Sequence, residues 1–248
     1  MLRNKILSLG RISKMLSLKK IALVLGTTAL LLSQSVFALP EALTANYSVH
    51  KGSLYLGDMK LTLSYAGNQY HYYKDTQAKG FAALITKASI KENVDGIFNG
   101  NSLNPTKYYF KQSTRKSTRI ENTRFSGVNA KGTYKDKGYD LKLPKGTLDR
   151  ASLELALAND ISNKKPVLSY NVMERGELKK YIFKRLGEEM LSTPSGSFTT
   201  TKVSVVRSGN KRSTTFWLAK ELGYMPVKII HKEKNDVIST VIKSYKTS

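Results

Sequence analysis

The fold of this chain is constrained most by a repeated alternation of apolar and polar residues, interrupted by turn residues at short intervals. From Met59 to Tyr65 every second residue is apolar, and Gly67-Asn68 follows as a turn signal. An alternation with a period of two places the apolar side chains on one face of an extended strand, which is typical of a half-buried antiparallel sheet. Further extended runs are recognised at 70–76, 106–113, 118–126, 139–143, 167–174, 178–186, 198–207, 213–218, 227–233 and 237–245.

Two stretches in the first part of the chain indicate how the strands are connected. Gly57-Asp58 is a turn signal between the run 47–56 and the alternating run that follows, so a hairpin is predicted there. Residues 81–90 fit either a short helix or a buried strand, because a short apolar run does not distinguish the two.

One helix interrupts the strands, after the break at 144–146. Thr147 is the expected N-cap, and Asp149 falls in the first turn, where the helix dipole favours an acid. Apolar residues then recur at helical spacing as far as Ala158, and the helix is expected to end near residues 159–160.

These elements predict a mainly β (α+β) fold. The expected architecture is a large curved antiparallel sheet of roughly eleven or twelve strands, forming a barrel or half-barrel with one principal helix covering it. No linker long enough to separate two domains interrupts the pattern, so residues 39–248 are predicted to form a single β-rich domain.

The first 38 residues have the layout of a secretory signal peptide. A basic stretch leads into the apolar run 21–32, and small residues at Ser35 to Ala38 follow. We expect cleavage after Ala38 and a periplasmic protein without a membrane span, because the apolar run is short. The chain has no cysteine, which excludes disulfides, a cysteine-linked lipid anchor and thiol chemistry.

The charge is strongly positive. The chain has 41 Lys and Arg against 18 Asp and Glu, and about +17 remains once the six basic residues of the leader are removed. Such a field attracts polyanions over long distances. For an exported protein these are anionic lipid headgroups and acidic glycans, and a nucleic acid is not expected as a partner. A lysine-rich solvated surface without a specific partner is the alternative.

No motif of a known enzyme class is present. The three histidines, His50, His71 and His231, lack the spacing of metal ligands, and there is no nucleophile elbow or glycine-rich phosphate loop. Serine and lysine three residues apart occur at Ser113 and Ser162, but in a strand run and a loop respectively. We therefore expect a protein that is not an enzyme and that has no catalytic residue, cofactor or metal site.

Two sets of residues are candidates for a binding site. The first is a basic rim, for which the alternative is charged edge strands that prevent aggregation: Lys111, Arg115, Lys116, Arg119, Arg124, Lys179 and Lys180. The second is the lining of an internal cavity, for which the alternative is ordinary core packing: Tyr72, Tyr108, Phe110 and Trp217.

The mature chain resembles a family of exported proteobacterial proteins, domain of unknown function 3108. The resemblance extends from about Tyr47 to Tyr245 and is carried by several landmarks in order: Tyr47-Ser-Val with Gly52, Gly57 and Leu61, Leu143-Pro-Lys-Gly-Thr147 with Asp149-Arg-Ala-Ser152, Thr193-Pro-Ser-Gly196, and Phe216-Trp-Leu-Ala219 with Tyr224-Met-Pro-Val-Lys-Ile229. The last landmark is also similar to the closing hairpin of LolA/LolB-like periplasmic proteins. This similarity implies a half-barrel scaffold that handles acyl chains, by analogy of fold only.

Two functions follow as hypotheses. In the first, the protein holds an apolar or lipid-like ligand, such as an acyl chain, in a β-barrel cavity whose basic rim meets the headgroup. In the second, it is an envelope interaction or assembly protein whose basic surface docks to lipopolysaccharide, peptidoglycan or a protein partner. The sequence leaves the ligand and the oligomeric state open.

Overall fold

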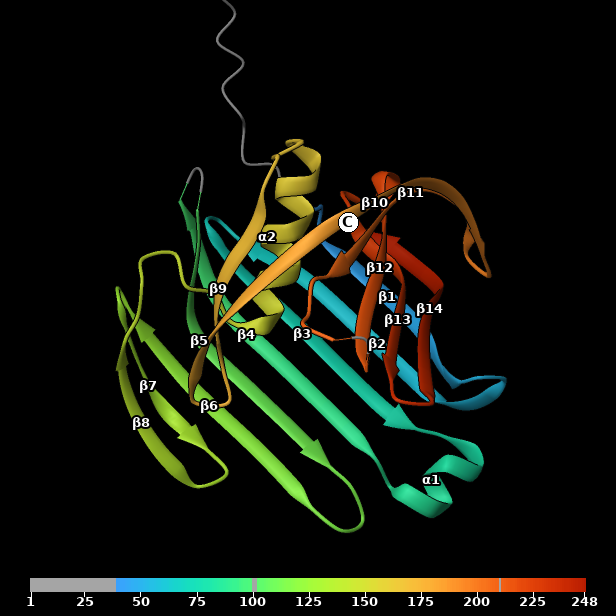
Figure 1. Cartoon of the computed structure of the whole chain (residues 1–248), viewed down its shortest axis with the longest axis horizontal. Coiled ribbons are helices and arrows are strands. Elements are labelled where there is room, and N and C mark those ends of the chain that lie inside the picture. The colour runs from blue at the N-terminus through green and yellow to red at the C-terminus, as the bar shows by residue number, and fades with distance from the viewer. Residues whose placement is uncertain (1–38, 100–101, 210) are drawn as a thin grey trace, which may run out of the picture. The chain divides into compact units, whose positions relative to one another are not determined.

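The computed structural model shows one antiparallel sheet of 14 strands and two α-helices (Figure 1). It describes residues 39–99, 102–209 and 211–248. The predicted signal peptide, residues 1–38, lies outside the described residues. The predicted fold class is confirmed: the chain is mostly strand, and its large antiparallel sheet approaches a barrel without closing.

In the described part of the chain, each strand pairs with its neighbours in sequence, except that the eighth and ninth strands do not pair and the first pairs with the last. The first eight are β1 (Leu43–Lys51), β2 (Leu54–Ala66), β3 (Gln69–Ala78), β4 (Ser89–Asn99), β5 (Ser102–Ser113), β6 (Thr118–Ser126), β7 (Asn129–Tyr134) and β8 (Lys137–Lys142). The remaining six are β9 (Leu168–Glu174), β10 (Glu177–Thr193), β11 (Gly196–Val205), β12 (Arg212–Ala219), β13 (Met225–Glu233) and β14 (Asp236–Thr247), with a 3-10 turn (Lys220–Leu222) between β12 and β13.

The break in the sheet is spanned by the helix α2 (Arg150–Ser162). The strand order begins at β8 and ends at β9, and β1 pairs with β14 in the middle, so the two edge strands are those that α2 connects. Among the described residues, one isolated bridge joins Leu148, in the segment before α2, to the edge strand β9: Leu148 N donates to Asn171 O at 2.9 Å and Met173 N donates to Leu148 O at 2.7 Å. The helix thus connects the two edge strands and packs against the inner face of the curved sheet.

The main core lies between α2 and the inner face of the curved sheet. Leu155 and Leu157 of the helix are buried together with Tyr47, Tyr72 and other inward-facing residues of the strands. Because both the helix stripe and the alternating strand positions are apolar, they bury each other's surface. In addition, α2 packs against β4, β5, β9 and β13.

The helix begins two residues later than predicted. Asp149, not Thr147, is the N-cap: its carboxylate accepts hydrogen bonds from the backbone of Ala151 at 2.7 Å and Ser152 at 2.9 Å. The hydroxyl of Thr147 instead donates to Pro144 O at 2.7 Å in the preceding turn. The helix also extends to Ser162, beyond the predicted end.

The predicted turn at Gly57-Asp58 is wrong. The first hairpin turns at Gly52-Ser53, and Gly57 lies inside β2, at a register shift where Val49 pairs with Gly57 and His50 with Tyr55. A Cβ at Gly57 would lie 2.0 Å from the carbonyl oxygen of Gln77, so this glycine allows the close approach of β3 at a bulge.

The stretch whose conformation the sequence left open contains a short helix. It is α1 (Gly80–Thr86), between β3 and β4, and it is followed directly by the strand residues from Ser89. Within the described residues, neither helix has the length and apolar character needed to span a membrane.

Candidate functional site

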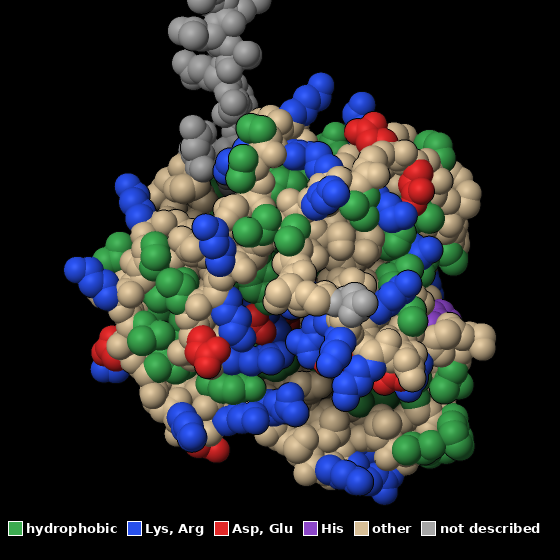
Figure 2. Space-filling view, in the orientation of Figure 1, with side chains coloured by type: hydrophobic (Ala, Val, Ile, Leu, Met, Phe, Trp, Pro, Cys, Tyr) green, Lys and Arg blue, Asp and Glu red, His purple; other side chains and the backbone are tan. Residues whose placement is uncertain are grey.

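A cavity of about 800 Å³ lies beside α2, between the helix and strands from both halves of the sheet. Arg150, Leu153, Glu154 and Leu157 of α2 form one wall, and the opposite walls come from β4, β5 and β6 and from β9 to β13. Figure 2 shows a hollow near the middle of this face of the molecule. Both halves of the chain therefore contribute to the same site.

Part of the lining is apolar. Leu153 and Leu157 face aromatic side chains of the strands, and the rings of Phe183 and Phe216 contact each other edge to face with centroids 6.0 Å apart. The apolar residues of the lining are Ile90, Phe110, Leu153, Leu157, Phe183, Val205 and Phe216. This wall would bury hydrocarbon from water.

The remainder of the lining is rich in cations. Six arginine or lysine side chains face four glutamates, which leaves two positive charges in excess. Figure 2 shows Lys and Arg gathered around the hollow. The cations are Arg119, Arg150, Arg175, Lys179, Arg207 and Arg212, and the acids are Glu92, Glu154, Glu174 and Glu233.

The cations differ in how far they are neutralised. Arg212 forms an ion pair with Glu233, whereas Arg119 and Arg207 have no acidic partner within 4.0 Å among the described residues. Both of these arginines are exposed to solvent. They can therefore accept an anion without first breaking an internal ion pair.

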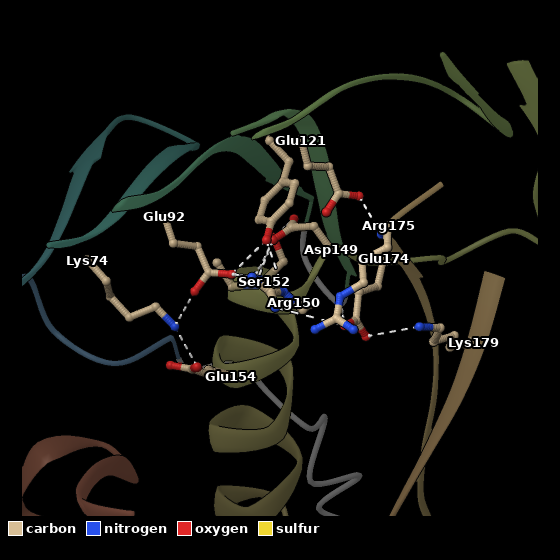
Figure 3. Close-up of polar contacts among 12 residues, drawn as sticks. Lys74, Glu92, Glu121, Asp149, Arg150, Ser152, Glu154, Glu174, Arg175 and Lys179 are labelled. Carbon is tan, nitrogen blue, oxygen red and sulfur yellow. Dashed lines mark hydrogen bonds and ion pairs between the residues drawn. The ribbon is translucent and has the colours of Figure 1, made fainter. Parts of the chain in front are cut away.

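A buried charge network forms the floor of the cavity beside α2 (Figure 3). The Lys74 ammonium lies 2.8 Å from Glu92 and 2.6 Å from Glu154, and Arg150 lies 2.9 Å from the other oxygen of Glu92. Tyr108 also donates to Glu92, at 2.7 Å. The network ties β3, β4 and β5 to the first turns of α2.

The charges in this network hold one another ionised. Burial alone would raise the pKa of Glu92, but Lys74 and Arg150 lower it to about 2. Burial alone would lower the pKa of Lys74, but Glu154 and Glu92 raise it above its usual value. An opposite charge at such short range favours the charged form of both partners.

A third acid joins the network to the β9–β10 hairpin. Glu174 lies 3.3 Å from Arg175, 3.9 Å from Arg150 and 4.0 Å from Lys179, and Tyr181 donates to it at 2.6 Å. Since Glu174 is buried, it fixes these cations at the edge of the cavity.

Of the predicted cavity residues, Phe110 lines the cavity, with the Arg150 guanidinium 4.3 Å from its ring centroid. Tyr72 and Tyr108 are buried and are not part of the lining, but they donate to Glu154 and Glu92, which are. Trp217 lies on the other face of β12 from Phe216, where it donates to Glu189. The ammonium groups of Lys202 and Lys228 lie 4.8 and 5.0 Å from its ring centroid.

Of the predicted basic rim, Arg119 and Lys179 line the cavity, and Lys180 lines an adjoining depression of about 580 Å³. Lys111 and Arg124 occupy alternate positions to inward-facing residues of β5 and β6, so they lie on the outer face of the sheet. Arg115 and Lys116 are in the β5–β6 turn. The structure thus places two of the seven rim residues in the lining of this cavity and a third, Lys180, in the adjoining depression.

The charged floor was not predicted, although the alternation contains a signal for it. Glu92 stands between Ile90 and Val94 at a position of β4 where an apolar residue is expected. A charged residue at a core-facing strand position is almost never buried unless it is paired. Arg150 carries no such signal, because it stands in the segment that begins the helix and its partner Glu92 is 58 residues away in sequence.

The sequence profile of DUF3108, described as a protein of unknown function, matches residues 46–242. The chain belongs to the DUF3108 family. The match confirms the family resemblance stated above, while the proteobacterial origin and the LolA/LolB-like hairpin stay predictions. Among curated proteins, none matches this DUF3108 chain.

One solved structure shows that the fold recurs outside DUF3108. A beta-barrel-like protein of domain of unknown function DUF1849 from Brucella abortus is similar with a TM-score of 0.58 and 9% identity, over 86% of this chain and 99% of that chain. A protein from Parabacteroides distasonis described as a "putative lipoprotein" has a TM-score of 0.37 and 13% identity, over 85% of this chain and 99% of that one. The first likeness supports the fold alone.

Proposed function

We propose that this DUF3108 protein binds an amphiphilic anion, an acyl chain with a carboxylate or phosphate headgroup, and does not convert it chemically. The observation that carries the proposal is one cavity of about 800 Å³ with an apolar wall and a cationic rim. This volume lies within the range of roughly 300–1,000 Å³ that small-molecule sites occupy.

Each part of such a ligand has a counterpart in the cavity. The hydrocarbon would lie along Leu153, Leu157 and Phe216, where each buried CH₂ contributes about 0.8 kcal/mol. The headgroup would meet Arg119 and Arg207. Hydrogen bonds from guanidinium to an anion are about twice as strong as neutral ones.

The first test measures binding by calorimetry with dodecanoate and dodecyl phosphate as probes. Dodecyltrimethylammonium, which has the same chain and the opposite charge, is the matched control probe. We expect the anions to bind at least 10-fold more tightly than the cation, because the rim carries an excess of positive charge. Equal affinity for all three probes, or no binding of any, would overturn the proposal.

The variants Arg119→Ser and Arg207→Ser test the rim itself. Each is expected to weaken dodecyl phosphate binding about 10-fold, the loss of one charge-assisted contact. Arg124→Ser is the control, since Arg124 is an exposed arginine of the same strand as Arg119 but faces outward. If Arg119→Ser and Arg207→Ser lose no more affinity for dodecyl phosphate than Arg124→Ser does, the headgroup lies elsewhere and the proposed site is contradicted.

We also propose that the protein acts in the periplasm, from the signal-peptide layout of residues 1–38. The mature protein is expected to begin at Leu39. Amino-terminal sequencing of the protein from a periplasmic extract checks this, and a chain that retains Met1 in the cytosolic fraction would contradict it.

A further inference from the structure

The helix α1 exposes its apolar side chains to water. Phe81, Leu84 and Ile85 are 67%, 72% and 55% exposed, and Ala82 is the buried residue of the helix. The spacing of i, i+3 and i+4 places the three side chains on one helix face. In a helix that packs on a core, this face would be turned inward.

The exposed face is held at a fixed place on the sheet. The backbone N–H of Arg115, in the β5–β6 turn, donates to Thr86 O at 2.8 Å, and its guanidinium donates to Leu84 O. On the other side, Lys79 N donates to Leu56 O at 2.9 Å. Seven residues are too few for a stable helix in isolation, so these contacts maintain α1 and the direction of its apolar face.

Basic residues surround this face. Lys79 and Lys87 flank α1 in sequence, and Arg115 and Lys116 lie in the turn that is bonded to it; all four are exposed. None has an acidic partner within 4.0 Å in the described part of the chain. Figure 2 shows a group of hydrophobic side chains at the place of α1, with Lys and Arg beside it.

The combination of an apolar face with basic neighbours fits one kind of partner, the surface of an anionic lipid bilayer. We propose that α1 is a membrane-docking tip, in which Phe81, Leu84 and Ile85 enter the acyl region while the four basic residues meet the headgroups. Apolar side chains on one helix face and Lys or Arg at headgroup level are the two contributions that bind interfacial helices. The inference goes beyond the proposed function, because it concerns a bilayer and not the ligand of the cavity.

The position of α1 also has a consequence for access to the cavity. Ile90, which lines the cavity, lies in the strand that begins directly after α1. Ile90 of β4 pairs with Gln112 of β5, and Gln112 pairs with Arg119 of β6. All three residues line the cavity, and they lie at the strand ends next to α1. A bilayer docked on α1 would therefore lie at the same end of the sheet as this part of the cavity.

The test uses a tryptophan placed in the tip by Phe81→Trp, so that the signal reports on α1 and not on any other segment of the full chain. Vesicles of phosphatidylglycerol and phosphatidylcholine should shift its fluorescence to the blue, and brominated lipid should quench it. The native Trp217 is buried and provides a constant background, which the wild-type protein measures. Vesicles of phosphatidylcholine alone should bind at least 10-fold more weakly, because they carry no net negative charge. The anionic vesicles at high salt should show the same loss, because salt screens exposed charges.

Two double variants distinguish binding through α1 from nonspecific binding through other exposed apolar side chains. Leu84→Ser with Ile85→Ser, added to the Phe81→Trp protein, should reduce its partition into anionic vesicles about 10- to 100-fold, with an unchanged circular dichroism spectrum. Val167→Ser with Met190→Ser removes side chains that are 65% and 67% exposed elsewhere and should change nothing. No blue shift with anionic vesicles, equal binding to both vesicle types, or equal effects of the two double variants would each overturn the proposal.

Discussion

Replacing Glu92 by alanine is expected to lower the free energy of unfolding by about 3–5 kcal/mol, the typical cost of removing one partner from a buried ion pair. Glu92 is 7% exposed and lies between Lys74 at 2.8 Å and Arg150 at 2.9 Å. Without it Arg150 retains an acid only at 3.9 Å, and the hydroxyl of Tyr108 loses its acceptor. The positive charges that remain are costly because the site excludes most of the water around them.

Urea unfolding at neutral pH measures this loss. Glu177→Ala is the matched control, because Glu177 also pairs with a lysine, Lys179 at 3.7 Å, but its side chain is 70% exposed. An exposed pair contributes about 0–1 kcal/mol, so the control should unfold almost as the wild type does. Equal losses for the two variants would contradict the buried network.

The same residue predicts how the protein responds to acid. The pKa of Glu92 is about 2 in the folded protein against a usual value of 4.5, so its ionised form stabilises the fold. This contribution is complete above pH 4.5 and is lost as the pH falls from about 4.5 toward 2. The Glu92→Gln variant lacks this titration, and its free energy of unfolding should fall less steeply over that interval than that of the wild type.

The sheet could be predicted because its signal is local. Strands such as β2 alternate polar and apolar residues, and the turn residues between strands fix the order of a meander. The pairing of β1 with β14 has no such signal, since Leu43 and Thr247 meet only when the whole chain has folded. The same holds for the break between β8 and β9, which decides where α2 and the cavity lie.

Two local errors show where turn and cap residues are ambiguous. A glycine is a turn signal at both Gly52 and Gly57. In the structure Gly52 is in the turn, whereas Gly57 is at a bulge inside β2, and what distinguishes the bulge is the close approach of Gln77, which is not visible in the local sequence. Thr147 and Asp149 are both good caps. The choice between them depends on the bridge that Leu148 makes to β9, which holds residue 148 in an extended conformation.

The site was predicted in part for the same reason. Arg119, Lys179 and Phe110 are predicted site residues because they are basic or aromatic residues in strands, and they do line the cavity. Alternation alone does not say which face of each strand is turned inward, so the same criterion also predicts Trp217 and Lys111, which lie on the other face. The acids of the floor come from strands and a helix that are far apart in sequence, so no spacing rule could join them.

For Glu121 the predicted dependence of stability on pH is opposite to that for Glu92: the protein is expected to lose stability as the pH rises. It is 0% exposed on β6; one of its oxygens accepts a hydrogen bond from Arg175 N at 2.6 Å, and the other has no partner among the described residues. Burial raises its pKa to about 7, against the effects of the Arg175 hydrogen bond and of Arg150. Glu121 therefore connects β6 to the β9–β10 turn, with a carboxyl group that stays protonated to a higher pH than an exposed glutamate does.

A raised pKa means that the folded protein binds this proton more tightly than the unfolded chain does. Stability therefore falls as the pH rises from about 4.5 to about 7, and the full loss, about 3 kcal/mol for a shift of this size, remains above that interval. Glu121→Gln keeps an oxygen for the Arg175 N–H but cannot ionise. We expect this variant to match the wild type near pH 4 and to be more stable at pH 8, by up to about 3 kcal/mol.

Urea unfolding at several pH values between 4 and 8 measures the difference, with Glu177→Gln as the exposed control. Asp149 complicates the lower part of the range, because burial raises its pKa to about 6 and its titration acts in the same direction. The difference between the variant and the wild type isolates Glu121, since Asp149 titrates in both proteins and its contribution cancels. If Glu121→Gln is less stable than the wild type at pH 8, the carboxylate is held ionised by a partner, and Arg150, whose charge lowers the pKa of Glu121, is the candidate. In that case the charged floor of the cavity extends to the break in the sheet, and Glu121 belongs to the same network as Glu92 and Glu174.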